Sequence, residues 1–262
     1  MALIKCDFFS RSLEKCSTIY AVLPQRETSG QIGIESSCKS EKFKCLLLLH
    51  GLSDDESIWM RRTSVERYAT EHGIAVIMPD ADRSFYTDMK CGGKYYTYIA
   101  KEVLSVAREF FNISDKREDT FIAGNSMGGY GALKIGLREN DIFSAAVGIS
   151  SVADIVERSI PKGEHYRDFK TTLIPVFGEE MVIPPEDDLF RLAKMKKENN
   201  EKFPALYLAC GKNDYMYEDN LKLKAHLESL NIDFTYEENE GYSHSWEYWD
   251  LIIQHILNWL PL

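Results

Sequence analysis

A serine between glycines near the middle of the chain has the spacing of a catalytic nucleophile. Gly124-Asn125-Ser126-Met127-Gly128 is a G-x-S-x-G motif between a strand-like apolar segment and an apolar pattern at helical spacing. A serine at so sharp a strand-to-helix turn has a strained backbone, so small residues two positions away on each side let strand and helix pass closely. At a helix N-terminus, the dipole and free N–H groups favour the negative charge that develops in acyl transfer. The motif predicts a nucleophile elbow with Ser126 at its tip.

A phosphate-binding turn is the alternative for this glycine-rich segment. A P-loop requires a lysine after its glycines, and none follows Gly129 directly. The G-x-G-x-x-G pattern of dinucleotide-binding turns does not fit the segment either. The sequence therefore favours the elbow.

A serine hydroxyl is a weak nucleophile near neutral pH, so it needs a base and an acid that orients the base. After an elbow of this kind, the acid and then the histidine follow along the chain. His244 lies in a loop with glycine and serine before the last predicted helix, and the alternative is a histidine that only caps this helix. Asp214 follows a predicted strand through a short turn and is the favoured acid. Asp219 is its main rival and Glu218 a weaker one, because both fall within the next predicted helix.

The tetrahedral intermediate of acyl transfer needs two N–H donors aimed at its oxyanion. One comes from the residue after the nucleophile and one from the loop after an early central strand. We therefore predict an oxyanion hole made by the backbone N–H groups of Met127 and Leu52. Gly51 allows the backbone to approach the acyl oxygen, although His50-Gly51 would also make a tight turn without this role.

Substrate contacts are predicted from aromatic residues in loops or helix starts near the catalytic edge. Such residues could line an acyl or alcohol pocket, although aromatic side chains more often belong to the core. The candidates are Trp59, Tyr86, Trp246 and Tyr248. Cys91 has no elbow around it, so we expect it to pack or to line a surface rather than to act as a nucleophile.

Four motifs resemble the esterase D and tributyrin esterase branch of the α/β-hydrolases. They are LLLHGLSDDESIW, GNSMGGYGALKIGL, CGKNDYMYEDN and GYSHSWEYWD, and they spread over nearly the whole chain. His50-Gly51-Leu52 resembles the HGL turn of that family, whereas Asn125 stands where many relatives carry an apolar residue. The resemblance implies an α/β-hydrolase fold and short-chain acyl esters, such as acetyl or butyryl esters, as substrates.

The apolar patterns alternate between strand and helix along the chain. Strands are predicted at 2–9, 16–23, 45–49, 74–78, 119–123, 143–149, 205–210 and 234–237, and helices at 65–72, 96–110, 223–230, 249–260 and after the elbow. We expect the first two strands to form an antiparallel hairpin and residues 25–42 to form a surface connection. The alternation implies a mostly parallel sheet with right-handed crossovers. Residues 151–200, which are interrupted by prolines, read as a modest insertion after the sixth strand, over the active-site edge of the sheet.

We therefore predict a single α/β-hydrolase domain over residues 1–262, with helices on both faces of its sheet. The net charge of −10 disfavours nucleic acids and anionic membranes as partners. The N-terminus lacks the apolar region of a signal peptide and no apolar run reaches membrane length, so a cytoplasmic location is expected. Six cysteines without a C-x-x-C pair predict reduced thiols rather than a disulfide framework or a zinc site. A homo-oligomer is left open.

The predicted function is a serine carboxylesterase that hydrolyses short-chain acyl esters, acetyl to butyryl or hexanoyl, without a metal or an organic cofactor. Its partner is then a small-molecule ester. A feruloyl or cinnamoyl esterase and an S-formylglutathione-type thioesterase are alternatives that use the same machinery. An acyltransferase or a non-catalytic binding module of the same fold are weaker alternatives, because no signal peptide is evident and the triad is intact.

Overall fold

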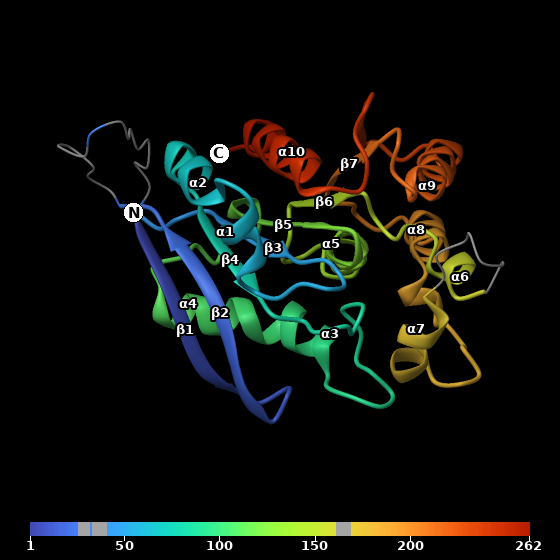
Figure 1. Ribbon diagram of the computed structural model, residues 1–262, viewed down its shortest axis with the longest axis horizontal. Helices are drawn as coiled ribbons and strands as arrows, with labels where there is room; N and C mark the ends of the chain where they lie inside the picture. The colour runs from blue at the N-terminus through green and yellow to red at the C-terminus, as the bar shows by residue number, and fades with distance from the viewer. Residues whose placement is uncertain (26–31, 33–40, 161–168) are drawn as a thin grey trace.

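Eight strands form one sheet in the order β1-β2-β4-β3-β5-β6-β7-β8 (Figure 1). The computed structural model describes residues 1–25, 32, 41–160 and 169–262. The strands are β1 Ala2–Ser10, β2 Lys15–Leu23, β3 Cys45–Leu49, β4 Ala75–Pro79, β5 Thr120–Asn125, β6 Ala145–Ile149, β7 Ala205–Gly211 and β8 Thr235–Asn239. The helical segments are α1 Ile58–Arg62, α2 Val65–His72, α3 Tyr95–Thr97, η1 Tyr98–Val103, α4 Leu104–Phe110, η2 Arg117–Asp119, α5 Met127–Arg138, α6 Ile155–Arg158, α7 Lys170–Phe177, η3 Pro185–Asp187, α8 Leu189–Glu198, α9 Tyr217–Ser229 and α10 Trp246–Trp259.

The sheet is mostly parallel, as predicted. From β4 through β3, β5, β6 and β7 to β8, all neighbouring strands run in the same direction. β1 and β2 form the predicted antiparallel hairpin, and β2 also pairs antiparallel with β4. Strand β3 is an uninterrupted run of buried cysteine and leucine, as expected for a strand that is covered on both faces.

Helices cover both faces of the sheet, and each face has its own hydrophobic core. One core joins α4, α5, α8 and α9 to the sheet. The other joins α1, α2 and α10 to the opposite face, where α2 and α10 lie together in Figure 1. Alternate residues of β3 enter the two cores: Leu47 and Leu49 face the first, while Leu46 and Leu48 face the second.

The helix that precedes the elbow strand departs from its predicted pattern. The apolar spacing predicts one amphipathic stripe that ends at Phe110, but Phe110 is more than half exposed. The helix contains the π-helical segment η1 between α3 and α4. A π turn holds more residues than an α turn, so it shifts the later residues around the helix axis. Leu104 and Ala107 therefore face the core in place of Phe110.

The segment predicted as an insertion after β6 contains α6, α7, η3 and α8 in its described part. α8, at its end, packs against α5 and α9, so it belongs to the helix layer that connects β6 to β7. α6 and α7 lie to one side of the sheet in Figure 1. Residues 161–168 of this segment, and most of the predicted surface connection 25–42, lie outside the described residues.

Candidate active site

The predicted elbow connects β5 to α5 at the carboxyl edge of the sheet. Ser126 has a φ of 56° and a ψ of −116°, a strained conformation for a residue with a side chain. Its backbone N–H donates to the Ile149 carbonyl at 2.8 Å, and its carbonyl accepts from the Val152 N–H at 3.2 Å. The neighbouring strand β6 and the loop that follows it therefore hold the elbow in place.

The two glycines of the motif lie where strand and helix approach most closely. A Cβ on Gly124 would lie 2.4 Å from the Gly128 carbonyl oxygen. A Cβ on Gly128 would lie 2.5 Å from the Leu49 carbonyl oxygen, at the end of β3. Both obstacles are backbone atoms, so neither position has room for a side chain.

Ser126, His244 and Asp214 form one hydrogen-bonded chain. His244 Nε2 lies 3.0 Å from Ser126 Oγ, although 118 residues separate the two in sequence. His244 Nδ1 lies 2.9 and 3.0 Å from the two carboxylate oxygens of Asp214. Because a carboxylate only accepts hydrogen bonds, Nδ1 carries the proton and donates it to Asp214. Nε2 is then free to accept a proton from the serine hydroxyl.

The carboxylate of Asp214 is fixed by its own loop. It also accepts from the Met216 N–H at 2.8 Å, and its side chain is fully buried. The imidazole of His244 packs on the Tyr215 ring, with centroids 4.5 Å apart, and meets Trp249 edge to face at 4.9 Å. These contacts hold both the acid and the base in one orientation.

The rival acids have other surroundings. Asp219, on α9, accepts from Arg158 Nε at 2.5 Å in an ion pair in which both side chains are buried. Burial raises the pKa of Asp219, while Arg158 acts in the opposite direction. Glu218 is exposed in the first turn of the same helix. Neither carboxylate contacts His244 among the described interactions.

The predicted oxyanion donors have no internal acceptor. Within the described part of the chain, no group accepts a hydrogen bond from the backbone N–H of Leu52 or of Met127. The turn that carries Leu52 is close to the elbow, because a Cβ on Gly51 would lie 3.7 Å from Ser126 Cβ. Two free donors therefore lie near the serine hydroxyl.

Two side chains hold the turn that precedes Leu52. His50 Nε2 accepts from the Ala81 N–H at 2.8 Å, so its Nδ1 carries the proton and donates to the Gly51 carbonyl at 2.7 Å. The Tyr86 hydroxyl donates to the His50 carbonyl at 2.8 Å. Burial raises the pKa of Tyr86 well above its ordinary value, which keeps this donor protonated. The sequence gives His50 a place in the turn but gives no signal for its bond to Ala81.

A cleft of about 240 Å³ opens beside the serine. It is lined by Gly51, Leu52, Ser53, Asp54, Ser126, Phe169, Tyr215, His244, Ser245, Trp246 and Trp249. Several of these residues are not among those predicted from the sequence. Tyr215 directly follows Asp214 in the sequence, and Ser245 directly follows His244. Their positions next to predicted catalytic residues could have identified them. Phe169 lies in the segment after β6, and no pattern in the sequence indicates that it lines the cleft.

Of the four aromatic residues predicted to contact substrate, only Trp246 lines this cleft. Trp59 is buried beneath it, with its indole N–H donating to the Leu49 carbonyl at 3.0 Å. Tyr86 is buried and supports the turn before Leu52, and Tyr248 is buried against Tyr242. We therefore correct the prediction for these three, because their rings fill the core instead of facing the cleft. The exposed Cys91 likewise lies outside the cleft lining.

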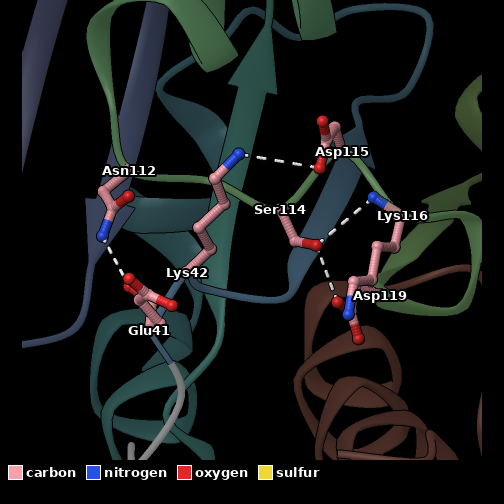
Figure 2. Close-up of a pocket in the computed structure, with 7 residues that line it drawn as sticks. All are labelled: Glu41, Lys42, Asn112, Ser114, Asp115, Lys116 and Asp119. Carbon is pink, nitrogen blue, oxygen red and sulfur yellow. Dashed lines mark hydrogen bonds and ion pairs between the residues drawn. The ribbon is translucent and has the colours of Figure 1, made fainter.

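A larger hollow, about 690 Å³, lies at the opposite edge of the sheet, near the amino ends of β3 and β5 (Figure 2). Its side chains contact one another: Lys42 pairs with Asp115 at 3.6 Å, and the Ser114 hydroxyl donates to Asp119 at 2.6 Å. Because Ser126 follows the carboxyl end of β5, this hollow is remote from the elbow. The described residues that line it include no histidine that could serve as a base for Ser114.

Metal ligation and membrane insertion find no support in the described residues. Residues 1–25, 32, 41–160 and 169–262 contain no cluster of three or more histidine, cysteine or carboxylate side chains placed to hold a metal ion. No helix in the same ranges combines the length and apolarity needed to cross a bilayer.

Known proteins that are similar to this chain in sequence and structure include esterases and serine hydrolases. A family described as "Putative esterase" matches residues 24–260. An acetyl esterase of Caldicellulosiruptor saccharolyticus is 33% identical over 266 residues, which cover 99% of this chain and 98% of the relative. The fluorophosphonate-binding serine hydrolase FphF of Staphylococcus aureus superposes with a TM-score of 0.86 at 34% identity, and S-formylglutathione hydrolase FrmB of Staphylococcus aureus superposes with a TM-score of 0.83 at 34% identity. Each structural comparison covers 99% of this chain and 98% of the other.

The fold and these relatives define the protein as an α/β-hydrolase of the serine esterase class. The chain belongs to the esterase family whose model spans residues 24–260. This assignment confirms the predicted fold and the esterase class. It is broader than the predicted esterase D and tributyrin esterase branch.

Proposed function

We propose that the protein is a serine carboxylesterase that hydrolyses short-chain acyl esters through an acyl-enzyme, within the esterase D and tributyrin esterase branch. The observation that carries the proposal is the continuous hydrogen-bonded chain from Ser126 through His244 to the buried carboxylate of Asp214. It lies beside a cleft and two free backbone N–H donors, which is what acyl transfer requires.

In the first half of the reaction, Ser126 Oγ attacks the carbonyl carbon of the ester while His244 Nε2 takes the hydroxyl proton. The N–H groups of Leu52 and Met127 stabilise the negative oxygen of the tetrahedral intermediate. The bond to the alcohol then breaks, and His244 returns its proton to the departing alkoxide. Asp214 stabilises the imidazolium in both steps.

In the second half, a water molecule attacks the acyl-enzyme and gives its proton to His244. The second tetrahedral intermediate collapses, the carboxylic acid leaves, and Ser126 Oγ recovers its proton. These steps are complete without a metal or an organic cofactor.

Acetyl esters are the first substrates to test, because a relative that is similar over the full length is named acetyl esterase. A thioester of the S-formylglutathione type is the second candidate, since FrmB of Staphylococcus aureus is 34% identical to this chain. A ferulic acid esterase at 22% identity supports the shared fold alone, so a feruloyl substrate has weaker support.

The proposal is tested with 4-nitrophenyl acetate and with a fluorophosphonate that modifies activated serines. We expect the wild-type protein to release nitrophenolate and to gain the mass of one phosphonyl group on the peptide that contains Ser126. The Ser126→Ala variant should remain folded by circular dichroism and gain no phosphonyl group. Its rate of ester hydrolysis should fall to a residual level about a thousandfold to ten-thousandfold above water. Full activity in this variant would refute the nucleophile, and an inert wild-type protein would refute the function.

A further inference from the structure

The carboxylate of Asp54 lies in the cleft but has no role in the proposed acyl-transfer mechanism. Its Oδ2 lies 3.1 Å from the position of a Cβ on Gly51, and Ser126 Cβ lies 3.7 Å from that same position. The carboxylate and the elbow therefore meet around Gly51. Asp54 is half-buried and lines the cleft together with Ser126 and His244.

The charges around Asp54 leave this side of the cleft acidic. Among the described residues, no lysine or arginine lines the cleft. Burial raises the pKa of Asp54, and Asp55 raises it further, whereas the exposed Arg62 on α1 and the Gly51 N–H lower it. Arg62 is the only arginine or lysine in this set, and Asp55 offsets its charge.

Aromatic rings form much of the remaining wall. Phe169, Tyr215, Trp246 and Trp249 all line the same cleft. Trp246 and Trp249 meet edge to face with centroids 4.8 Å apart. Aromatic faces attract cations through their quadrupoles, and more strongly where water is partly excluded. A nearby carboxylate adds its own Coulomb attraction for the cation. A cleft with aromatic walls and a carboxylate should therefore bind a cationic ligand more tightly than a neutral ligand of the same shape.

We propose that Asp54 selects esters whose alcohol part carries a positive charge, such as quaternary or primary amino alcohols, over neutral and anionic esters. This inference rests on the proposed esterase function and specifies its substrate class. Anionic thiol carriers such as glutathione, which bears two carboxylates and one ammonium group, are disfavoured by the same charge.

The test compares acetylcholine with 3,3-dimethylbutyl acetate, which has the same shape but a carbon in place of the charged nitrogen. We expect kcat/KM to be about tenfold higher for the cation at low ionic strength and the difference to shrink as salt is added. In Asp54→Asn the ratio should fall to about one. The amide oxygen keeps an acceptor for the Gly51 N–H, so the turn should remain in place.

The ratio of the two specificity constants isolates the charge effect. Any effect of the Asp54 charge on the oxyanion cancels in this ratio, because both substrates form the same oxyanion. Asp141→Asn is the matched control, because it removes one negative charge from the exposed loop before β6, at the opposite edge of the sheet. It should leave the ratio unchanged.

A second measurement uses binding without turnover. Tetramethylammonium chloride should inhibit hydrolysis of the neutral ester competitively, more strongly than sodium chloride at equal ionic strength, and about tenfold less strongly in Asp54→Asn. Two results would refute the selection while the esterase function stands, provided that the neutral ester is hydrolysed. One is a ratio of specificity constants near one in the wild-type protein, and the other is a ratio that stays high in Asp54→Asn. If neither ester is hydrolysed, the function and the selection both fall.

Discussion

Asp214 and Asp219 lie close together in the sequence, yet their carboxylates have different partners. Asp214 accepts from the imidazole of His244, whereas Asp219 is bound by the guanidinium of Arg158. We expect Asp214→Asn to lower kcat by about 10⁴, because the amide stabilises the imidazolium poorly and favours the wrong tautomer of His244. Steady-state rates with an acetyl aryl ester measure this effect.

Asp219→Asn is the control for Asp214→Asn. It removes the carboxylate that accepts from Arg158 Nε between two buried side chains, so it should lower the midpoint of thermal unfolding. Its kcat at a temperature well below that midpoint should stay within a few-fold of wild type. A large loss of kcat in Asp219→Asn together with an active Asp214→Asn would mean that the acid has been assigned to the wrong carboxylate.

The polar residues that meet at the site could be located from the sequence better than the aromatic ones. Ser126 has a motif, and Asp214 and His244 follow strands in the order that the fold imposes. Trp59 and Tyr86 have no comparable mark, since the same ring can fill a core or line a cleft. Their positions depend on acceptors contributed by distant segments, the carbonyls of Leu49 and His50.

At the scale of elements, the elbow depends on the distance between β5 and α5. We expect Gly124→Ala to destabilise the protein by about 3 kcal/mol or more, because the new Cβ would meet a backbone carbonyl that cannot move away. Urea unfolding measures the loss.

Comparison with Gly241→Ala distinguishes the cost of this clash from the cost of backbone strain. Gly241 has a φ of 79° and no atom within 4 Å of its Cβ position, so an alanine there suffers only the conformational cost, about 1 to 2 kcal/mol. If the two variants lost the same stability, close packing at the elbow would not be the reason for the glycine.

Lys134 joins three elements by a buried ammonium group. It lies on α5, and its Nζ donates to the Phe85 carbonyl at 3.1 Å, to Thr87 Oγ1 at 2.7 Å and to Asp187 at 3.0 Å. Lys134→Met should cost about 3 kcal/mol at pH 7, because Asp187 keeps only its longer contact to Arg138.

The same lysine should make the stability of the protein depend on pH. Burial lowers the pKa of Lys134 from 10.5 to about 8. Between these two values the unfolded chain binds more protons than the folded one, so this group makes the protein more stable as the pH rises. The stability difference between wild type and Lys134→Met should therefore grow by about 1.5 kcal/mol from pH 8 to pH 9.5. Urea titrations at several pH values test this, and a difference that shrinks over the interval would contradict the lowered pKa.

Local patterns were strong enough to predict the eight strands and the helices α2, α4, α5, α9 and α10, as in the run Cys45–Leu49 and the elbow motif. Local patterns could not predict the π-helical turn before α4, which depends on how the helix fits against the sheet. Residues 151–200 read as an insertion, because the sequence does not show that their last helix, α8, packs against α5 and α9 as the crossover from β6 to β7.

At the scale of the molecule, we expect the size of the cleft to limit the length of the acyl chain. Leu52 comes from the turn after β3 and Phe169 from the segment after β6, and both wall the cleft of about 240 Å³. Each added methylene gains about 0.8 kcal/mol while it is buried, so kcat/KM should rise over the first carbons and then stop rising. We expect a maximum between acetyl and hexanoyl esters in a series of 4-nitrophenyl esters. Specificity constants that climb up to palmitoyl would show a longer channel.

The distance in sequence between Ser126 and His244 has a consequence for the timing of activity during synthesis. The ribosome makes the proposed nucleophile first, the acid second and the base last, with 118 residues between nucleophile and base. At about 5 to 20 residues per second, roughly 6 to 24 seconds pass between the two ends of this hydrogen-bonded chain. During that interval the nascent polypeptide has the proposed nucleophile without its base, so we expect activity to begin only after β8 has joined the sheet and α10 has packed against it. A growing chain should therefore not hydrolyse esters through this triad until almost all of its fold has been made.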